Sequence, residues 1–285
     1  MIPAPFGYTR AGSVDEAVSA LAEHGDEAKV LAGGQSLLPL LRLRLAYPEM
    51  LVDVGRIPEL RGVRDEGDSL VVGAMTSHHD IINDPLVRQH CGLLAEATAT
   101  VADPAVRHRG TLGGALAHAD SAGDLPAVVL ALDGEFVVRG PGGRRTVPAS
   151  EFFVDYLQSA LGADEVLVEV RLPKLGAGWG FCYEKFHRVA QAWAIVGVAA
   201  AVRRENGSIA EARVGLTNMG PVPVRAREVE GALRGAAAGQ EALSSAAERA
   251  AEGTSPSTDL NADAEYRQHL ARVLTRRALA AAAGV

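Results

Sequence analysis

Two short glycine-bearing turns constrain how this chain can fold. The first is AGGQS at residues 32–36, and the second is TLGG at residues 111–114, with the polar run HADSAGD at 118–124 close behind. Each turn follows a segment that we expect to be ordered and precedes an apolar segment that we expect to be a helix; AKVLA and LLPLLRLRL flank the first. The sequence therefore predicts two loops that present bare backbone N–H groups to one ligand.

The backbone chemistry of the first turn predicts that this ligand is an anion. Gly33 and Gly34 can adopt backbone angles closed to other residues, and they let a ligand approach the main chain. Successive N–H groups in such a turn form an anion-binding concavity, a following helix adds its dipole, and Ser36 can add a hydroxyl donor. Four or five such bonds, at about 1.5–3 kcal/mol each, would hold a diphosphate without a neighbouring lysine. The alternative is that the glycines serve only the geometry of the turn.

Neither turn matches a common nucleotide-binding fingerprint. The chain has no glycine-rich loop ending in GK and Ser or Thr, and no G-x-G-x-x-G that opens a βαβ unit. A P-loop NTPase and a Rossmann-type dinucleotide fold are therefore disfavoured.

Length, charge and cysteine content limit the class of protein further. The 285 residues are 48% hydrophobic, enough for a sizeable core and two or three subdomains. A net charge of −7 without a basic tract disfavours nucleic acid as a partner. No apolar run has the length of a membrane span and the N-terminal segment lacks signal-peptide features, so we expect a cytoplasmic protein. Cys91 and Cys182 lack a C-x-x-C context and are expected to be buried thiols rather than a disulfide or metal site.

The chain divides into three blocks of an α+β protein: residues 1–55, 56–177 and 178–285. Strands are expected at AKVLA and MLVDV in the first block, at SLVVGAM, FVVRG and EVLVEVRLP in the second, and at FCYEKF, AIVGVAAAVRR and ARVGLTN in the third. The last three read as an antiparallel sheet. Helices are expected at 14–23, after Ser77, at 125–132 and over the terminal AEYRQHLARVLTRRALAAA.

The histidine-bearing motifs do not favour a metal site. SHHD at 77–80 stands where a helix should begin, and His118 with Asp120 falls in the second loop, where polar side chains can serve a ligand. Arg107 and Arg109 precede the TLGG turn. They are expected either to assist a phosphate or, with slightly more weight, to pair with surface carboxylates.

A set of motifs carries a resemblance to a known family. They are, in order, IPAPFGY, LAGGQSLLPLLRLRLA, LVDV, VGAMTSH, ADPAVRHRGTLGG, AHADSAGDLPA, YEKFHR, GLTNMG and AEYRQHLARVLTRRA. With these motifs the chain resembles the medium, FAD-binding subunit of the molybdenum-containing hydroxylases, the group that includes aerobic carbon monoxide dehydrogenase and relatives of xanthine dehydrogenase. The match covers nearly the whole chain at the family's spacing.

The resemblance implies a fold, a cofactor and partners. It implies an FAD-binding region of two α/β subdomains of the vanillyl-alcohol-oxidase (PCMH) type, and a C-terminal domain with a three-stranded antiparallel sheet and helices. The partners would be a small subunit with two [2Fe-2S] clusters and a large subunit with the molybdenum cofactor, as a dimer of heterotrimers. Electrons would pass from molybdenum through the clusters to FAD and then to an external acceptor. Two isolated cysteines in this chain agree, since one cluster normally needs four ligands.

The resemblance also places the FAD contacts on particular residues, with no catalytic residue and no metal ligand in this chain. Residues 32–36 would wrap the diphosphate, and the second wall would supply the Thr111 hydroxyl and the backbone amides of residues 112–114. The full set of implied contacts is Ala32, Gly33, Gly34, Gln35, Ser36, Leu37, Val101, Thr111, Leu112, Gly113, Gly114, Ala115, Asp124, Lys185 and Trp193.

Four of these residues have competing interpretations or depart from the family. Asp124 would accept hydrogen bonds from the ribose or adenine end of FAD, or else cap the helix at 125–132. Lys185 would lie near the flavin, or else be a solvated strand residue. Ala115 replaces a frequent asparagine, which should weaken FAD binding by about 0.5–1.5 kcal/mol. Trp193 replaces a tyrosine of the carbon monoxide dehydrogenases; it would pack on the flavin and limit oxidant access, or else be a core residue.

Two other functions compete with the electron-transfer subunit. One is an assembly or interaction protein that keeps the fold but binds FAD weakly or not at all, with Ala115 as an early sign. Retention of all four glycines of the two turns argues against it. The other is a self-contained flavin oxidase of a small alcohol or amine, but no side chain stands out as its base.

Overall fold

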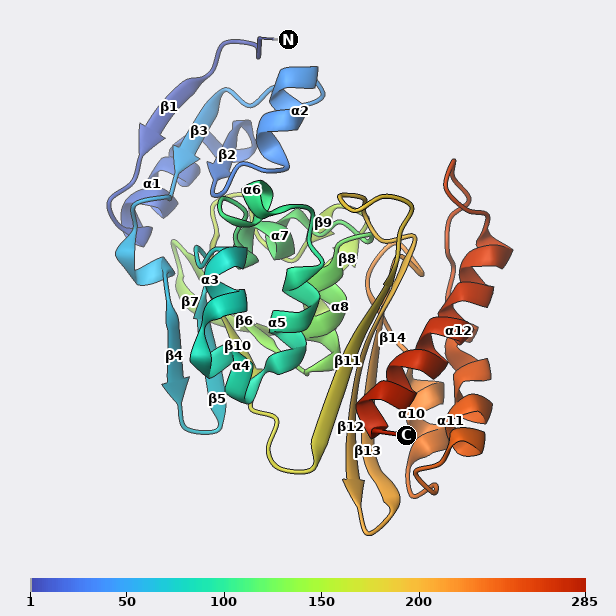
Figure 1. The fold of residues 1–285 in the computed structure, drawn as a ribbon. Helices are drawn as coiled ribbons and strands as arrows, with labels where there is room; N and C mark the ends of the chain where they lie inside the picture. Colours follow the sequence, from blue (N-terminus) through green and yellow to red (C-terminus); the bar gives the residue numbers. More distant parts are fainter. Residues whose placement is uncertain (1) are drawn as a thin grey trace.

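The computed structural model describes residues 2–285, which form three main sheets in chain order (Figure 1). The first is a parallel sheet in the order β1-β3-β2, made of β1 (Gly7–Arg10), β2 (Ala28–Leu31) and β3 (Met50–Asp53). Helix α1 (Val14–His24) begins at Ser13, whose hydroxyl caps it, and packs its buried Val14, Ala17, Val18 and Leu21 against this sheet. The predicted helix and both strands of this region are confirmed, whereas β1 was missed because its sequence GYTR contains no apolar run.

The second sheet has five strands in the antiparallel order β4-β5-β10-β6-β7. They are β4 (Val63–Glu66), β5 (Ser69–Gly73), β6 (Glu135–Gly140), β7 (Gly143–Pro148) and β10 (Val166–Pro173). The helices between β5 and β6 are α3 (His78–Asn83), α4 (Pro85–His90), α5 (Gly92–Ala99), α6 (Pro104–Arg107), α7 (Leu112–His118) and α8 (Asp124–Ala131). A smaller unit follows with α9 (Ala149–Phe152), β8 (Phe153–Asp155) and β9 (Gln158–Ser159).

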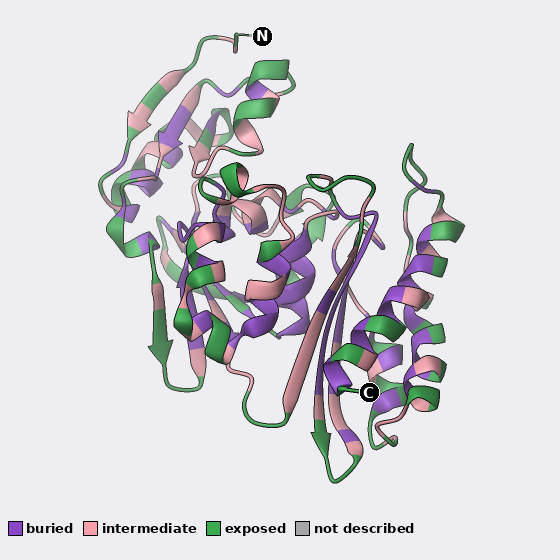
Figure 2. Ribbon diagram, viewed as in Figure 1, coloured by how far each residue is buried: buried purple, intermediate pink, exposed green. Residues whose placement is uncertain are grey.

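Helix α8 is buried along its whole length (Figure 2). After Asp124 its sequence LPAVVLA is apolar on every side, which suits a helix covered on all faces. One side packs on the third sheet, where a side chain at Gly215 would collide with the Ala127 carbonyl oxygen, and α8 shares one hydrophobic cluster with strands of the second sheet. The helix thus joins the two sheets into one core.

The third sheet has the antiparallel order β11-β12-β13-β14. Its strands are β11 (Trp179–Phe186), β12 (Val196–Glu205), β13 (Ser208–Thr217) and β14 (Val224–Arg225). Helices α10 (Arg227–Leu233), α11 (Gln240–Ala247) and α12 (Ala264–Ala283) cover the face opposite α8 (Figure 1). The three predicted strands are confirmed, but the expectation of a three-stranded sheet is corrected to four because two residues after the GLTNMG turn pair with β13.

Three 3₁₀ segments complete the architecture, at Gly25–Glu27, Pro58–Leu60 and Glu248–Ala251. Strand β12 is buried on both sides, so Val196, Val198 and Val202 pack on the C-terminal helices while Ala199 and Ala201 face α8. None of the helices between residues 2 and 285 combines the length and the apolar character needed to cross a bilayer.

The second glycine-bearing turn differs from its prediction. TLGG does not form a turn ahead of the helix at 125–132; Thr111 caps a separate short helix, and Leu112 to Gly114 form the first turn of that helix, α7. The hydroxyl of Thr111 accepts the N–H of Gly114, as an N-cap does.

Candidate functional site

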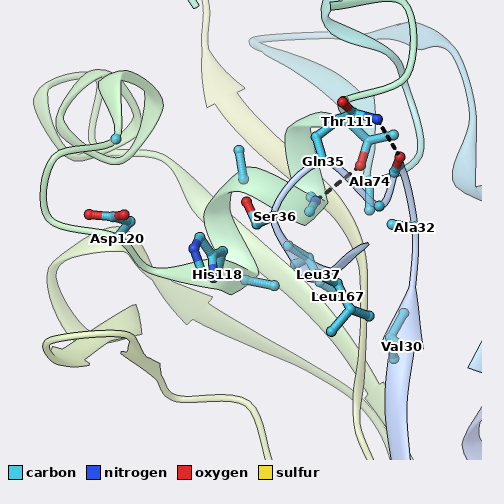
Figure 3. A pocket seen from close by; sticks show the side chains of 18 of the residues that line it. Val30, Ala32, Gln35, Ser36, Leu37, Ala74, Thr111, His118, Asp120 and Leu167 are labelled. Carbon is cyan, nitrogen blue, oxygen red and sulfur yellow. Dashed lines mark hydrogen bonds between the residues drawn. The ribbon is translucent and has the colours of Figure 1, made fainter. Parts of the chain in front are cut away.

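A cavity of about 640 Å³ runs between the loop that follows β2, the start of α7, strand β10 and the segment after β11. Its volume lies in the range of cofactor-sized pockets. Every residue of the implied FAD set lines it except Leu112, which is fully buried in the core under the second sheet. Figure 3 shows side chains from both predicted loops, among them Gln35, Ser36 and Thr111, around this one cavity.

The first wall of the cavity is the loop from Ala32 to Leu37. Gly34 has φ +75°, a conformation that favours glycine, and Ser36 leads into α2 (Leu37–Leu43) without capping it through its side chain. Among residues 2–285, no acceptor is in hydrogen-bond range of the N–H groups of Gly33, Gly34, Gln35 and Ser36. All four residues line the cavity, and none of their N–H groups is used within the described chain.

Gly33 has a second role, because it lets the two walls meet. A Cβ at Gly33 would collide with the Arg109 carbonyl oxygen and lie 2.8 Å from its carbon and 2.9 Å from Gly110 Cα. Across the same junction, a Cβ at Gly114 would lie 3.6 Å from Ala32 Cβ. The geometric interpretation of the first glycine pair therefore applies at Gly33, and ligand binding by the pair stays a prediction.

The second wall differs chemically from the first. The N–H of Leu112 donates to Thr76 O at 3.1 Å, that of Gly113 to Ala74 O at 2.8 Å, and that of Gly114 to Thr111 Oγ1 at 3.2 Å. The expectation that residues 112–114 offer free amides is therefore wrong, since the first two hold α7 against the segment that follows β5 and the third is used by the N-cap of α7. A Cβ at Gly113 would lie 2.5 Å from Ala74 Cβ, so this glycine serves packing. Ala115, whose N–H donates to Thr111 O, also lines the cavity.

Asp124 and Lys185 form a buried ion pair in the cavity wall. Lys185 Nζ lies 2.8 Å from Asp124 Oδ2, and the two side chains are 3% and 4% exposed. Burial raises the pKa of the Asp124 carboxyl although Lys185 opposes it. The alternative interpretations of both residues are wrong: Gly123, not Asp124, occupies the cap position of α8, and Lys185 is not solvated.

Tyr183 is a residue of this site that sequence reasoning missed. Its hydroxyl donates to Asp124 Oδ1 at 2.7 Å, and burial raises its pKa well above 10. A signal was present: Tyr183 and Lys185 are two apart in the YEKF strand, and residues at that spacing share a face.

Trp193 lies at the cavity in the segment 187–194, which leaves β11 and returns to β12. The Ile195 N–H donates to Phe186 O at 2.8 Å, so this segment begins and ends beside Lys185. The Trp193 side chain is 55% exposed, which excludes the alternative of a core tryptophan. Gln191 also lines the cavity and donates to Asp103, whose carboxylate caps α6.

The remaining polar candidates divide into two groups. His118 and Asp120 line the cavity, and Asp120 also accepts the Ala122 N–H at 2.9 Å. The guanidinium of Arg107 instead donates to the Val101 and Ala102 carbonyls, and neither Arg107 nor Arg109 lines the cavity. Neither arginine is therefore placed to assist a phosphate in this cavity, and the pairing of Arg107 with surface carboxylates is not seen.

His78 lines the cavity as a buried, neutral imidazole. Its Nδ1 lacks a hydrogen-bond partner among residues 2–285, and burial, with the charge of Arg107, lowers its pKa to about 4. No group of three or more potential metal-binding side chains occurs in the described part of the chain.

The low pKa of His78 predicts a loss of stability in mild acid. The unfolded chain binds a proton at an ordinary histidine pKa of about 6.5, whereas the folded chain does not until about pH 4. Stability therefore falls as the pH falls through this window, by roughly 2 kcal/mol between pH 7.5 and pH 5. Urea unfolding at both pH values should show this loss shrinking in His78→Leu, and an unchanged pH dependence in that variant would contradict the assignment. Exposed His269→Gln is the control.

The residues of the cavity fit FAD. The free N–H groups of the first wall suit a diphosphate, and Leu37, Val30 and Leu167 supply apolar surface. Lys185 adds a cation and Trp193 an aromatic ring to the lining of the cavity. Fold and cavity together define a protein of the nucleotide-cofactor-binding class.

Comparison with known proteins gives the family. Residues 4–175 match the FAD binding domain in molybdopterin dehydrogenase, and residues 181–282 match the CO dehydrogenase flavoprotein C-terminal domain. The carbon monoxide dehydrogenase medium chain of Hydrogenophaga pseudoflava is 45% identical over 99% of this chain and 98% of its own. Subunit alpha of the 6-hydroxypseudooxynicotine dehydrogenase complex of Paenarthrobacter nicotinovorans is 37% identical over 99% and 96%.

A solved structure agrees with these sequence matches. The carbon monoxide dehydrogenase from Hydrogenophaga pseudoflava that lacks the Mo-pyranopterin moiety superposes with a TM-score of 0.97, at 47% identity over 99% of this chain and 98% of that one. The chain therefore belongs to the FAD-binding medium subunits of the molybdenum hydroxylases, and it is an oxidoreductase subunit whose cofactor is FAD.

Proposed function

We propose that this chain relays electrons through FAD, from the [2Fe-2S] clusters of a small partner subunit to an external acceptor. The observation that carries the proposal is the cavity in which four free N–H groups of the first wall share one space with Lys185 and Trp193. FAD, when bound, supplies a ring that accepts and donates electrons. This chain's residues bind the diphosphate, orient the cofactor and shield it.

The proposed assembly has three kinds of subunit. A large subunit with the molybdenum cofactor oxidises the substrate, and the complex is a dimer of heterotrimers. In this chain Cys91 and Cys182 are both free thiols, Cys91 buried and Cys182 half-buried, so they leave cluster binding to the partner. Unpaired thiols also agree with the proposed cytoplasmic location.

The proposed contacts differ between the two walls. Gly33, Gly34, Gln35 and Ser36 hold the diphosphate through their backbone N–H groups, whereas the second wall contributes the Thr111 hydroxyl and the surface of Gly114 and Ala115. The carboxylate oxygens of Asp124 are occupied by Tyr183 and Lys185, so a ribose contact there would need to share them.

The proposal is tested by producing this chain together with its small and large partner subunits and measuring flavin by absorbance and mass spectrometry. One FAD per copy of this chain, reduced when substrate is added, is the expected result. A complex that contains molybdenum and clusters but no flavin would overturn the proposal in favour of an assembly protein.

Trp193 is expected to slow the reaction of reduced FAD with oxygen. Its side chain is half exposed at the cavity, where an indole placed over the flavin would limit access of small oxidants. In Trp193→Ala the reduced complex should be reoxidised by oxygen several-fold faster in stopped-flow absorbance. Val189→Ala, at a 65% exposed position of the same segment, is the matched control. An unchanged rate in Trp193→Ala would rule out this role.

A further inference from the structure

A chain of buried polar contacts connects Tyr183 to the cavity. The Tyr183 side chain is 5% exposed, and its hydroxyl donates to Asp124 Oδ1 at 2.7 Å. The other carboxylate oxygen, Oδ2, accepts from Lys185 Nζ at 2.8 Å, and Nζ also donates to Thr100 O at 3.1 Å. The group joins strand β11 to the end of α5 and the start of α8.

The hydrogen bonds among Tyr183, Asp124 and Lys185 leave one N–H donor unused. Both carboxylate oxygens of Asp124 are engaged, and an ammonium has three N–H donors, of which Lys185 uses two. One N–H of Lys185 therefore remains. Lys185 and Asp124 line the cavity, whereas Tyr183 is not among the described residues that do.

We propose that Tyr183 is a positioning residue that sets the reduction potential of the flavin without touching it. Its hydroxyl fixes the Asp124 carboxylate, and the carboxylate with Thr100 O fixes the Lys185 ammonium so that its remaining N–H serves the cofactor. This inference rests on the proposed function, because it needs FAD in the cavity.

Electrostatics predicts that loss of the Tyr183 hydroxyl lowers the reduction potential of the flavin. A reduced flavin carries more negative charge than an oxidised one, so a cation in the cavity wall favours the reduced form. The Tyr183 O–H dipole points at the carboxylate and offsets part of its negative charge. Loss of this hydroxyl makes the wall more negative and frees Asp124 to move, and both changes weaken binding of the reduced form.

The experiment is spectroelectrochemical titration of the complete complex containing Tyr183→Phe. Reduced FAD should be stabilised about tenfold less relative to oxidised FAD, which for a two-electron couple is a fall of about 30 mV in the flavin potential. Tyr266→Phe removes a hydroxyl from a 43% exposed tyrosine outside the group, and should leave the potential unchanged.

A double-mutant comparison separates positioning from a general structural role. If Tyr183 acts through the ion pair, Tyr183→Phe added to Asp124→Asn/Lys185→Met should produce no further fall in the potential. The inference is overturned by a Tyr183→Phe complex that retains FAD with an unshifted potential, or by an equal shift in the double-variant background. Absence of FAD from the wild-type complex would instead refute the proposed function.

Discussion

Replacing Gly33 by alanine is expected to reduce FAD affinity by about 10- to 100-fold. The added Cβ would collide with the Arg109 carbonyl oxygen and lie 2.9 Å from Gly110 Cα, both backbone atoms that no side-chain rotation can move aside. The first wall must shift, which displaces the free N–H groups of residues 33–36 from the ligand. Overpacking of this kind costs about 1–3 kcal/mol, and each 1.4 kcal/mol is a factor of ten in affinity.

The measurement is FAD release from the purified complex, followed by flavin fluorescence. Gly231→Ala is the matched control, because a Cβ there meets no atom within 4 Å and the residue lies inside α10. It should retain FAD and be stabilised by up to about 1 kcal/mol, since alanine favours a helix over glycine. If Gly33→Ala bound FAD as tightly as Gly231→Ala does, the close contact between the two walls at Gly33 would not be needed to position the N–H groups of residues 33–36.

Replacing Lys185 by methionine is expected to destabilise the chain by about 3–5 kcal/mol. The substitution leaves the Asp124 carboxylate 4% exposed without its cation, and an uncompensated buried charge carries a cost of this size. Asp124→Asn/Lys185→Met removes both charges while the Tyr183 hydroxyl can still donate to the amide oxygen. The double variant should therefore lose less than about 1.5 kcal/mol in urea unfolding.

The pH dependence of Lys185→Met checks the cause. Burial already raises the pKa of Asp124, and removal of Lys185 takes away a group that lowers it. The folded variant then binds a proton that the unfolded chain releases, so its stability falls as the pH rises. The deficit of Lys185→Met relative to wild type should thus shrink between pH 8 and pH 5. A constant deficit, or a double variant as unstable as the single one, would contradict a buried ion pair.

Most of the fold could be predicted from local sequence because the strong signals are local. The parallel strands AKVLA and MLVDV, the three long strands of the third sheet and the terminal helix all follow from runs of apolar or periodic residues. The strands β1, β4 and β14 could not, since their sequences GYTR, VRDE and VR contain no apolar run. They form because a neighbouring strand supplies the hydrogen-bond partners.

The two walls of the site likewise differ in whether local sequence predicts their hydrogen bonding. Free N–H groups were predicted for both, but only the loop of residues 33–36 has them. The amides of residues 112–114 donate to Thr76, Ala74 and Thr111, two of which lie more than thirty positions earlier in the chain. No local pattern contains that information.

The sequence by itself determined the alternation of elements, the place of the two glycine-bearing segments and, through its motifs, the family and FAD. Only the tertiary structure decided which wall has unused N–H groups, that Leu112 faces the core, and that Lys185 pairs with Asp124, whose other carboxylate oxygen accepts from Tyr183. The physical reason is that a buried polar group must find a partner, and which partner it finds depends on what long-range packing brings within about 3 Å.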